Sequence, residues 1–344
     1  MPMNVPSQAA KRFLRRRLVP IRIPVEATRT LEASGSLAWF SNRLLMSLAI
    51  MASCGISIFV GSATFVSAGQ SVSLSQLWRE VRQKGRYVPP GRTELQQAER
   101  LFLQTFRGQD GIDQLSSAWS ELDFELLPLQ IAGEQIWVLR EKPGFRKGRG
   151  FYAFRHQDAV PTAIQAPHCF YDEHTQAIAV RLFRESFAAA TAWNTLHRAI
   201  ADLPHSRGNY LDAFTRAFAA AHATAMVVQL HGFAQEKRRT EAAASADLII
   251  SGGTIYPSRW LQESVALFQQ HFPHGTVRLY PHEVSELGGT TNVQGEILRS
   301  ASSDGFMHLE LSDPLRRKMR RDRSVRQEFL EGLSKSYAAR VRKD

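Results

Sequence analysis

From residue 160 onward, short apolar runs of strand length alternate with amphipathic stretches of helical length. Turn-forming residues bound the apolar runs, which therefore predict strands, and the stretches between them have helical spacing of apolar residues. We expect strands over 162–165, 225–230, 247–251, 276–280 and 306–311, and helices over 176–184, 187–200, 209–222, 258–271 and 325–341. This alternation predicts an α/β fold with a mixed, largely parallel sheet flanked by helices, and ligands of such folds bind beyond the carboxyl ends of the strands.

The chain before residue 160 has a different pattern. Apolar residues recur at helical spacing over 71–125, whereas 126–156 holds strand-like runs separated by glycines. This predicts a small helical and β-hairpin region ahead of the α/β domain. We therefore divide the chain into a basic N-terminal leader (1–43), a signal peptide or membrane anchor (44–68), a helical and β-hairpin N-terminal region (69–156), and an α/β domain with a basic C-terminal helix (157–344).

The segment 44–68 is mostly apolar and contains no charged residue, and eight Lys or Arg precede it. A positive flank followed by a membrane-length apolar stretch is typical of an export signal or a membrane anchor. Small residues at 66–68 suit cleavage of a signal peptide. We expect the rest of the chain to be exported, either periplasmic or anchored to the membrane through 44–68 if that segment is not cleaved.

The net charge of +11 is concentrated at the two ends of the chain. Residues 1–43 carry eight Lys or Arg against two acids and residues 315–344 carry eleven against four, so the remainder carries a net charge of −2. No helix-turn-helix, zinc-finger or RNA-binding motif is present, so we expect no specific nucleic acid partner. The basic C-terminal stretch could contact an anionic surface, which we rank lowest. We expect no disulfide between Cys54 and Cys169.

Three short stretches place ionisable residues in or just after apolar strands. The first offers His168 with Asp172 and Glu173, the second offers His231 before a glycine, and the third offers Glu310 inside an apolar strand. A hydrolytic zinc site needs about three His, Asp or Glu ligands, an open position for water and a separate general base. Because these residue types are all present, we hypothesise a zinc-dependent amide hydrolase.

Each of these residues also has a plain structural explanation. Asp172 could cap the helix that follows it, and His231 could be a buried histidine with satisfied hydrogen bonds. Glu310 shares one face of its strand with His308, and that face could instead meet water. The choice between Glu173 and Asp172 as the carboxylate ligand stays open.

Arginine and asparagine side chains are candidates for binding the substrate. A guanidinium can hold a carboxylate through two hydrogen bonds, and Arg198, Arg207, Arg238 and Arg239 follow the two histidine motifs most closely. We select Arg198 and Arg239 as substrate-binding candidates. Asn292 is a third, because it lies in a glycine-bearing loop before the last strand and such a loop could reach the site.

In their order and strand context, the motifs resemble the zinc carboxypeptidase-like superfamily, in the broad sense that includes poly-γ-glutamate hydrolases and N-formylglutamate amidohydrolases. The resemblance covers about residues 160–335. It rests on Pro-His at 167–168 with Glu173 five residues later, on a strand ending in Leu-His-Gly at 230–232, and on a late strand ending in Leu-Glu-Leu-Ser at 309–312.

The resemblance implies a phosphorylase/hydrolase-like α/β fold and a set of roles for named residues. His168, Glu173 and His231 would bind Zn²⁺, with Asp172 as the rival carboxylate ligand. Glu310 would be the general base. The residues that follow His168 are Cys-Phe-Tyr, where small glycine-rich residues are common in the family, so the substrate stays open.

The implied function is that of a zinc-dependent hydrolase that cleaves an amide or peptide bond, of the carboxypeptidase or amidohydrolase type. It would act outside the cytoplasm on a peptide or an N-acyl amino acid, with a metal-activated water and a Glu general base. The alternative is a catalytically inactive, membrane-anchored binding module of the same fold, which would bind no metal or would bind it without turnover.

Overall fold

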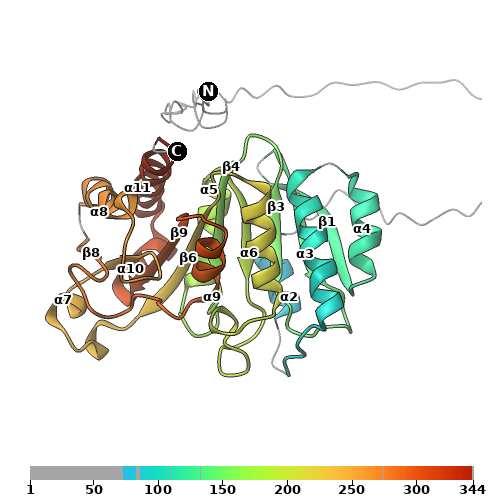
Figure 1. Ribbon diagram of the computed structural model, residues 1–344, viewed down its shortest axis with the longest axis horizontal. Coiled ribbons are helices and arrows are strands. Elements are labelled where there is room, and N and C mark those ends of the chain that lie inside the picture. Colours follow the sequence, from blue (N-terminus) through green and yellow to red (C-terminus); the bar gives the residue numbers. More distant parts are fainter. Residues whose placement is uncertain (1–72, 83–85, 109, 132, 274, 343–344) are drawn as a thin grey trace, which may run out of the picture. The chain divides into compact units, whose positions relative to one another are not determined.

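The computed structural model describes residues 73–82, 86–108, 110–131, 133–273 and 275–342 (Figure 1). The leader 1–43, the signal or anchor segment 44–68 and Cys54 lie outside the described residues. Across those described ranges, no helix is both long enough and apolar enough to cross a membrane.

Nine strands of the described chain form one mixed sheet. They are β1 (Phe124–Ile131), β2 (Glu134–Glu141), β3 (Phe151–Arg155), β4 (Val160–Ala166), β5 (Ala188–Trp193), β6 (Met226–Phe233), β7 (Leu248–Ser251), β8 (Val277–Leu279) and β9 (Phe306–Ser312). Their spatial order is β1-β2-β3-β5-β4-β6-β9-β7-β8. Strands β4, β5, β6 and β9 run parallel to one another, whereas β1 to β3 continue the sheet antiparallel from β5. Strand β7 is antiparallel to β9 and parallel to β8.

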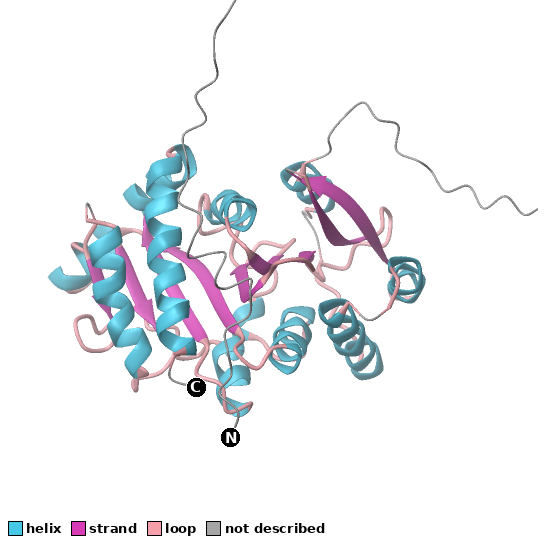
Figure 2. Cartoon of the chain, turned by 90° about the horizontal axis from the view of Figure 1, so that it is seen from above, coloured by secondary structure: helices cyan, strands magenta, loops and turns pink. Residues whose placement is uncertain are grey.

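Helices cover both faces of this sheet (Figures 1 and 2). They are α2 (Leu74–Val81), α3 (Arg92–Arg107), α4 (Ile112–Ser120), α5 (Thr175–Glu185), α6 (Tyr210–Ala221), α7 (Glu241–Ala244), α8 (Arg259–His271), α9 (Val293–Ser300), α10 (Asp313–Arg321) and α11 (Arg323–Val341), with short 3₁₀ helices η1 (Leu203–His205) and η2 (Gln235–Lys237). The apolar cluster on one face includes side chains of α2, α5, α8, α10 and α11, and the other includes α3, α4, α6 and α9. The predicted α/β fold, a mixed sheet flanked by helices, is confirmed.

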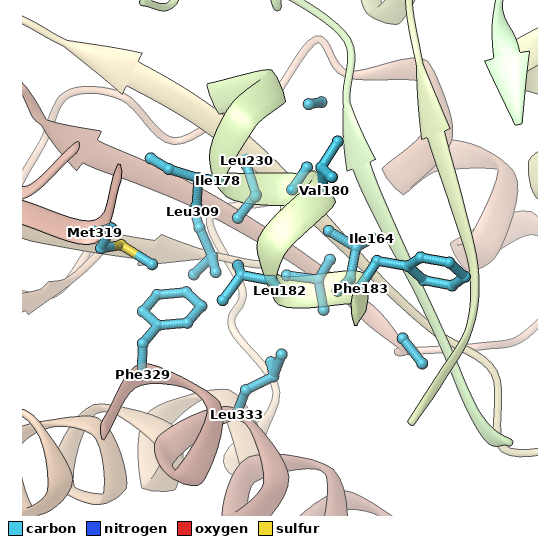
Figure 3. Packing of buried hydrophobic residues seen from close by; sticks show 14 of the residues in the cluster. Ile164, Ile178, Val180, Leu182, Phe183, Leu230, Leu309, Met319, Phe329 and Leu333 are labelled. Atoms are coloured by element: carbon cyan, nitrogen blue, oxygen red, sulfur yellow. The ribbon is translucent and has the colours of Figure 1, made fainter. Parts of the chain in front are cut away.

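The core beneath α5 holds the strands that carry the candidate site. Ile178, Leu182 and Phe183 of α5 are fully buried and belong to the same apolar cluster as Ile164 of β4 and Leu309 of β9 (Figure 3). Burying an apolar side chain of this size stabilises the fold by about 1.5 to 3 kcal/mol. This packing fixes α5 on the sheet, and with it the turn that joins β4 to α5.

Residues 188–193 form β5 in the interior of the sheet, although the sequence pattern predicted a helix over 187–200. Every residue of β5 is buried, and its run Ala-Ala-Ala-Thr-Ala-Trp has neither charge nor alternation. Alanine favours helices in isolation, but a strand covered on both faces also has an uninterrupted run of small and apolar residues. Pairing with β3 on one side and β4 on the other outweighs the local preference.

Helices α9 and α10 occur where the sequence pattern predicted none, as does the four-residue helix α7. Helix α9 begins inside the expected glycine-bearing loop, and Asn292 caps it by accepting from the N–H groups of Gln294 and Gly295. Helix α10 follows β9 directly, with the Ser312 side chain as its N-cap and a proline in its first turn. Helices α9 and α10 are both short, and each begins at a capping residue. A cap is a single residue and produces no periodic pattern of apolar residues, so a prediction from helical periodicity does not include these helices.

The boundary that was drawn between 69–156 and 157–344 falls between two strands of the same sheet. Strand β3 pairs with β5, so residues before 157 extend the sheet that carries the candidate site. The glycine turns and strand-like runs in this region are β1, β2 and β3, and the helical spacing before them corresponds to α2, α3 and α4.

Three arginines of the basic C-terminal stretch are buried. Arg326 donates to both carboxylate oxygens of Glu185, at 2.9 and 2.7 Å. Arg340 pairs with Asp304 at 3.1 Å, and Arg316 donates to backbone carbonyls near the candidate site. These three charges hold the fold together, so they add little to any contact with an anionic surface.

Candidate metal centre

His168 and Asp172 lie in a tight turn between β4 and α5. The backbone N–H groups of Tyr171 and Asp172 both donate to the His168 carbonyl, each at 2.8 Å. Thr175 closes the turn, because its hydroxyl and its N–H donate to the Asp172 carbonyl at 2.7 and 3.1 Å. Residues four apart in such a turn share one side. The imidazole and the carboxylate therefore face the same way, and both are buried.

His231 reaches the same place from the neighbouring strand. Strand β6 lies beside β4, with Gln229 paired to Gln165 near the carboxyl end of β4. His231 follows two residues later and is therefore level with the turn that begins after β4. It lies inside β6, not after it as the predicted strand end at residue 230 would place it.

Three atoms that can bind a metal converge at this point. The Nδ1 atoms of His168 and His231 are 3.1 Å apart, and Asp172 Oδ2 lies 3.4 Å from each of them. All three side chains are between 2 and 4% exposed. Asp172 Oδ2 has no hydrogen-bond partner among the described residues. We name these three residues the His–Asp–His cluster.

The second nitrogen of each imidazole is engaged outside the cluster. His168 Nε2 lies 2.7 Å from a carboxylate oxygen of Asp202, and His231 Nε2 lies 2.9 Å from the side-chain oxygen of Gln229. Both partners accept hydrogen bonds, so each Nε2 carries a proton. Burial lowers the pKa of His231 to about 4. This imidazole is neutral near pH 7, and its Nδ1 is a bare acceptor.

The carboxylate of Asp172 is ionised. Burial alone would raise the pKa of Asp172, but the neighbouring imidazoles of His168 and His231 outweigh burial and hold this pKa below its ordinary value. A buried anion therefore faces two imidazole nitrogens, and its Oδ2 has no hydrogen-bond partner among the described residues. Such a group is costly to bury unless a cation or a donor compensates for it.

The geometry of the cluster fits a metal ion. Tetrahedral zinc binds nitrogen and carboxylate oxygen at about 2.0 to 2.2 Å, which places its ligand atoms about 3.3 Å apart. The separations in the His–Asp–His cluster are 3.1, 3.4 and 3.4 Å. Acceptors held at these distances, with hydrogen bonds on the outer side of both imidazoles, are typical of a metal site. The described residues of the cluster therefore fit the metal that the motifs predicted.

Glu310 lies beside the cluster on β9. It is opposite His231 in the register of β6 and β9, and the metal-binding atoms of His231, His308 and Glu310 lie within 4.8 Å of one another. Burial, together with the Asp172 carboxylate, raises the pKa of Glu310 well above its ordinary value, although nearby arginines oppose the shift. Its Oε2 has no hydrogen-bond partner among the described residues.

The structure does not bring Glu173 into the cluster. Its side chain is 74% exposed, and its carboxylate lies 3.6 Å from His174. The backbone explains the difference. The turn after β4 places the residue four positions after His168, which is Asp172, on the same side as the imidazole, whereas Glu173 is five positions after it and points elsewhere. Asp172, the rival in the sequence prediction, occupies the position of the carboxylate in the cluster.

No family model and no curated protein matches the sequence. Among solved structures, the chain is similar to N-formylglutamate amidohydrolase from Ralstonia eutropha, at 11% identity and a TM-score of 0.40, over 57% of this chain and 100% of that chain. It is similar to a bacteriophage poly-gamma-glutamate hydrolase, at 11% identity and a TM-score of 0.35, over 54% of this chain and 87% of that chain.

A third similar structure is a metallo-carboxypeptidase from Burkholderia cenocepacia, at 11% identity and a TM-score of 0.34, over 68% of this chain and 67% of that chain. These proteins are hydrolases of the kinds that the motifs indicated. The activity of this chain has to follow from the residues of its own site.

Of the arginines selected from the sequence, Arg198 lies at the cluster and Arg239 does not. Arg198 donates to Asp202 at 2.8 Å, and its Nη1 lies 3.5 Å from His168 Nδ1. The Arg239 side chain is 88% exposed and lies 3.9 Å from Glu286. The two arginines that were not selected also pair away from the cluster, Arg207 with Glu296 and Arg238 with Glu286.

Asn292 is buried behind the cluster and does not face a substrate. Its side chain caps α9 and donates to the side-chain oxygen of Gln229 at 2.6 Å. It therefore contacts the site through the residue that holds His231. The sequence prediction therefore selected a residue of the site region, and the contacts that the structure gives it are with Gln229 and the first turn of α9.

Sequence reasoning missed Asp202 and Gln229, and it placed His308 on the same strand face as Glu310 without giving it a role. Gln229 lies two residues before His231 on an apolar strand, so period-two alternation could have identified it as well. No such signal exists for Asp202. It lies in the loop after β5, thirty-four residues from His168, and only the fold brings its carboxylate to the imidazole.

Proposed function

We propose that this chain is a zinc-dependent hydrolase that cleaves an amide or peptide bond, of the amidohydrolase or metallopeptidase type. One observation carries the proposal: the Nδ1 atoms of His168 and His231 and the unpaired Oδ2 of Asp172, all buried, converge at 3.1 to 3.4 Å. A bound cation is the simplest way to stabilise such an arrangement.

The ligand types favour zinc. Two imidazoles and one carboxylate suit Zn²⁺, whereas Ca²⁺ and Mg²⁺ prefer sites made of oxygen atoms alone. Hydrolytic zinc sites have three protein ligands and leave a fourth position open, whereas structural sites have four. His168, Asp172 and His231 would hold the ion, and Asp202 would orient His168 from outside.

A zinc ion held there would supply a Lewis acid for the scissile carbonyl and for the attacking water. Glu310 takes the proton of that water and transfers it to the leaving nitrogen. Its burial and free Oε2 suit this role, because a carboxyl group whose pKa is raised is a stronger base than an exposed one. Gln229 accepts the hydrogen bond from His231 Nε2, which leaves Nδ1 as the atom that faces the metal position.

Arg198 is the best-placed group for an anionic part of the substrate. Its guanidinium lies beside His168, and Asp202 holds it there through Nη2. Its other N–H groups could bind a substrate carboxylate or the oxyanion that forms during attack. The substrate class that suits this arrangement is a peptide or an N-acyl amino acid.

The proposed site of action lies outside the cytoplasm. It is supported by the sequence alone, because the apolar segment 44–68 follows eight Lys or Arg. Cell fractionation and sequencing of the mature N-terminus would test it. A soluble, intact chain in the cytoplasm would contradict export.

Elemental analysis of the purified full-length chain tests the metal. We expect about one zinc per chain in the wild type, loss of zinc in His168→Ala, Asp172→Ala and His231→Ala, and full retention in the matched control Glu173→Ala. A screen of amide and peptide substrates would follow, with the zinc-loaded wild type.

A well-folded wild type that binds no zinc, even when zinc is supplied, would remove the basis for hydrolysis. The inactive binding module would then be the better explanation of the fold. Loss of zinc in Glu173→Ala, with retention in Asp172→Ala, would contradict the ligand set but leave a metal site in place.

A further inference from the structure

The Nε2 atom of His231 contacts the buried amide of Gln229, which is hydrogen-bonded in turn to the buried amide of Asn292. This atom lies 2.9 Å from the side-chain oxygen of Gln229, and the same oxygen accepts from Asn292 Nδ2 at 2.6 Å. Gln229 and His231 are two residues apart on β6, so their side chains share one face of the sheet. Gln229 is fully buried and Asn292 is 1% exposed. Both amides must therefore find their hydrogen bonds inside the protein.

Gln229 belongs to a chain of hydrogen-bonded side-chain amides that leads away from His231. We call it the amide chain, and it ends at two groups that act as hydrogen-bond acceptors. Gln229 Nε2 donates to the amide oxygens of Gln165 and Gln294, at 2.9 and 3.0 Å. Gln294 donates in turn to one carboxylate oxygen of Asp212 at 2.8 Å, and the other oxygen of Asp212 accepts from the backbone N–H of Gly208 at 2.7 Å. Gln165 donates to the hydroxyl of Thr215 at 3.1 Å, and that hydroxyl already gives its own proton to a backbone carbonyl at 2.8 Å.

The near side is fixed by a helix cap. The Oδ1 of Asn292 accepts from the backbone N–H groups of Gln294 and Gly295 at 3.0 and 3.2 Å, so its NH₂ group must face Gln229. Turning the Gln229 amide round would bring its NH₂ against the NH₂ of Asn292. It would also bring its oxygen against the oxygens of two other glutamines. Each amide in the chain therefore has one permitted direction.

This direction decides where the proton of His231 lies. The Gln229 oxygen must face the imidazole and cannot donate to it, so His231 must donate from Nε2. A neutral imidazole has one proton, and Nδ1 is then left as a bare acceptor. Without such a partner a neutral histidine divides between two tautomers. The tautomer with its proton on Nδ1 cannot bind a metal through that atom.

We propose that Gln229 is a positioning residue for His231, and that the one-way amide chain anchored at Asp212 keeps the His–Asp–His cluster ready for metal before the metal binds. This inference deepens the proposed zinc function and rests on it. It adds a role for Gln165, Gln229, Asn292 and Gln294, all of which are buried polar side chains that the chemistry itself does not use.

The tautomer of His231 in the metal-free full-length chain is the first test. NMR of selectively labelled histidine distinguishes a protonated from a bare ring nitrogen by its chemical shift. We expect the proton on Nε2 near neutral pH. A proton on Nδ1 would overturn the proposal. The measurement needs neither zinc nor activity, so failure of the zinc function and failure of the positioning role are distinguishable.

Zinc competition titration of Gln229→Met against Gln165→Met is the second test. Both variants remove a buried amide from the same chain, but only Gln229 contacts His231. Loss of an outer partner of a metal-bound histidine typically weakens binding about 10- to 100-fold, so we expect such a loss in Gln229→Met and a loss below about threefold in Gln165→Met.

Gln229→Glu keeps an acceptor toward His231 and should keep the Nε2-protonated tautomer, although its second oxygen loses the hydrogen bonds to Gln165 and Gln294 and should lower the stability of the fold. Equal losses of zinc affinity in Gln229→Met and Gln165→Met would contradict the positioning role, because a general loss of packing affects both. Unchanged affinity in Gln229→Met would contradict it as well. If Gln229→Met does not fold, the tautomer of the wild type decides the question.

Discussion

His231 and Glu310 lie directly opposite each other on the adjacent parallel strands β6 and β9. The register of two buried strands therefore brings a proposed metal ligand and the proposed general base together, with no contribution from a loop. Side chains at paired positions of neighbouring strands share one face of the sheet. Because the two residues belong to different strands and have different roles, each can be removed while the other stays in place.

Glu310→Gln should retain zinc and lose turnover. Glutamine has nearly the shape of the glutamate but cannot take a proton, and general acid–base catalysis typically contributes about 10²- to 10⁴-fold in rate. We expect a fall in kcat of that size with about one zinc per chain still bound, measured by elemental analysis beside steady-state kinetics. Turnover near that of the wild type would show that another group is the base.

Asp202→Ala should weaken zinc binding without removing a ligand. The carboxylate accepts from His168 Nε2 at 2.7 Å and so orients the ring and fixes its tautomer. We expect an affinity loss of about 10- to 100-fold, measured by competition with a chelator. Glu173→Gln is the matched control, because its side chain is 74% exposed. A similar loss in the control would remove the special role of Asp202.

Arg198→Ala should raise KM for substrates that carry a free carboxylate. Hydrogen bonds to a charged group are worth roughly 1.5 to 3 kcal/mol, so KM should rise about 10- to 100-fold. The measurement is made at saturating zinc, because Arg198 also contacts Asp202. Arg239→Ala, whose side chain is 88% exposed, should leave KM unchanged. Amidated substrates should show no difference between the wild type and Arg198→Ala.

The sequence predicts most of this sheet and two of the three residues of the His–Asp–His cluster, with the third left as a rival, and the reasons differ. Helices such as α8 have an amphipathic period that is visible locally, whereas β5 is buried on both faces and has no period at all. His168 and His231 could be selected because each lies beside a strand end or glycine in an apolar context.

The choice between Asp172 and Glu173 required the backbone. The two carboxylates are adjacent, and loops impose no period that favours one of them. The N–H of Asp172 donates to the His168 carbonyl, and this single turn decides which residue faces the imidazole. Asp202 and the amide chain behind Gln229 depend on contacts between distant segments, so no local pattern could reveal them.

Gly232→Ala should lower the free energy of unfolding, because the added methyl group would clash with the guanidinium of Arg316 next to the candidate site. A Cβ at this position would lie 2.6 Å from Arg316 Cζ. That guanidinium cannot easily move, because it donates to the carbonyls of Glu173 at 2.8 Å and Phe233 at 3.0 Å. Overpacking of this kind typically costs about 1 to 3 kcal/mol.

Thermal or denaturant unfolding of Gly232→Ala measures this cost, and zinc titration measures its effect on the nearby turn. Gly111→Ala is the control, because a Cβ there meets no atom within 4 Å. The prediction fails if the two variants are equally stable, since the clash with Arg316 would then be relieved at no cost.

His222→Phe should make the chain more resistant to acid without touching the metal centre. Burial lowers the pKa of His222 from 6.5 to about 4, its Nε2 has no hydrogen-bond partner in the described chain, and its ring lies against Phe106 and Phe218. Between these two values the unfolded chain binds the proton and the folded chain does not. Stability from the neutral ring is therefore present above pH 6.5 and is lost as the pH falls toward 4.

A phenylalanine at residue 222 keeps the aromatic packing and cannot be protonated. At about 1.4 kcal/mol per pH unit, the wild type should lose roughly 2 kcal/mol between neutral pH and pH 5 from this group, and the variant should not. Denaturant unfolding of both proteins at pH 7 and pH 5 measures the difference. If the difference in unfolding free energy between the two proteins were the same at pH 7 and pH 5, the prediction would be wrong. His222 would then have the same pKa in the folded and unfolded chains, which means that its ring is solvated in the folded state.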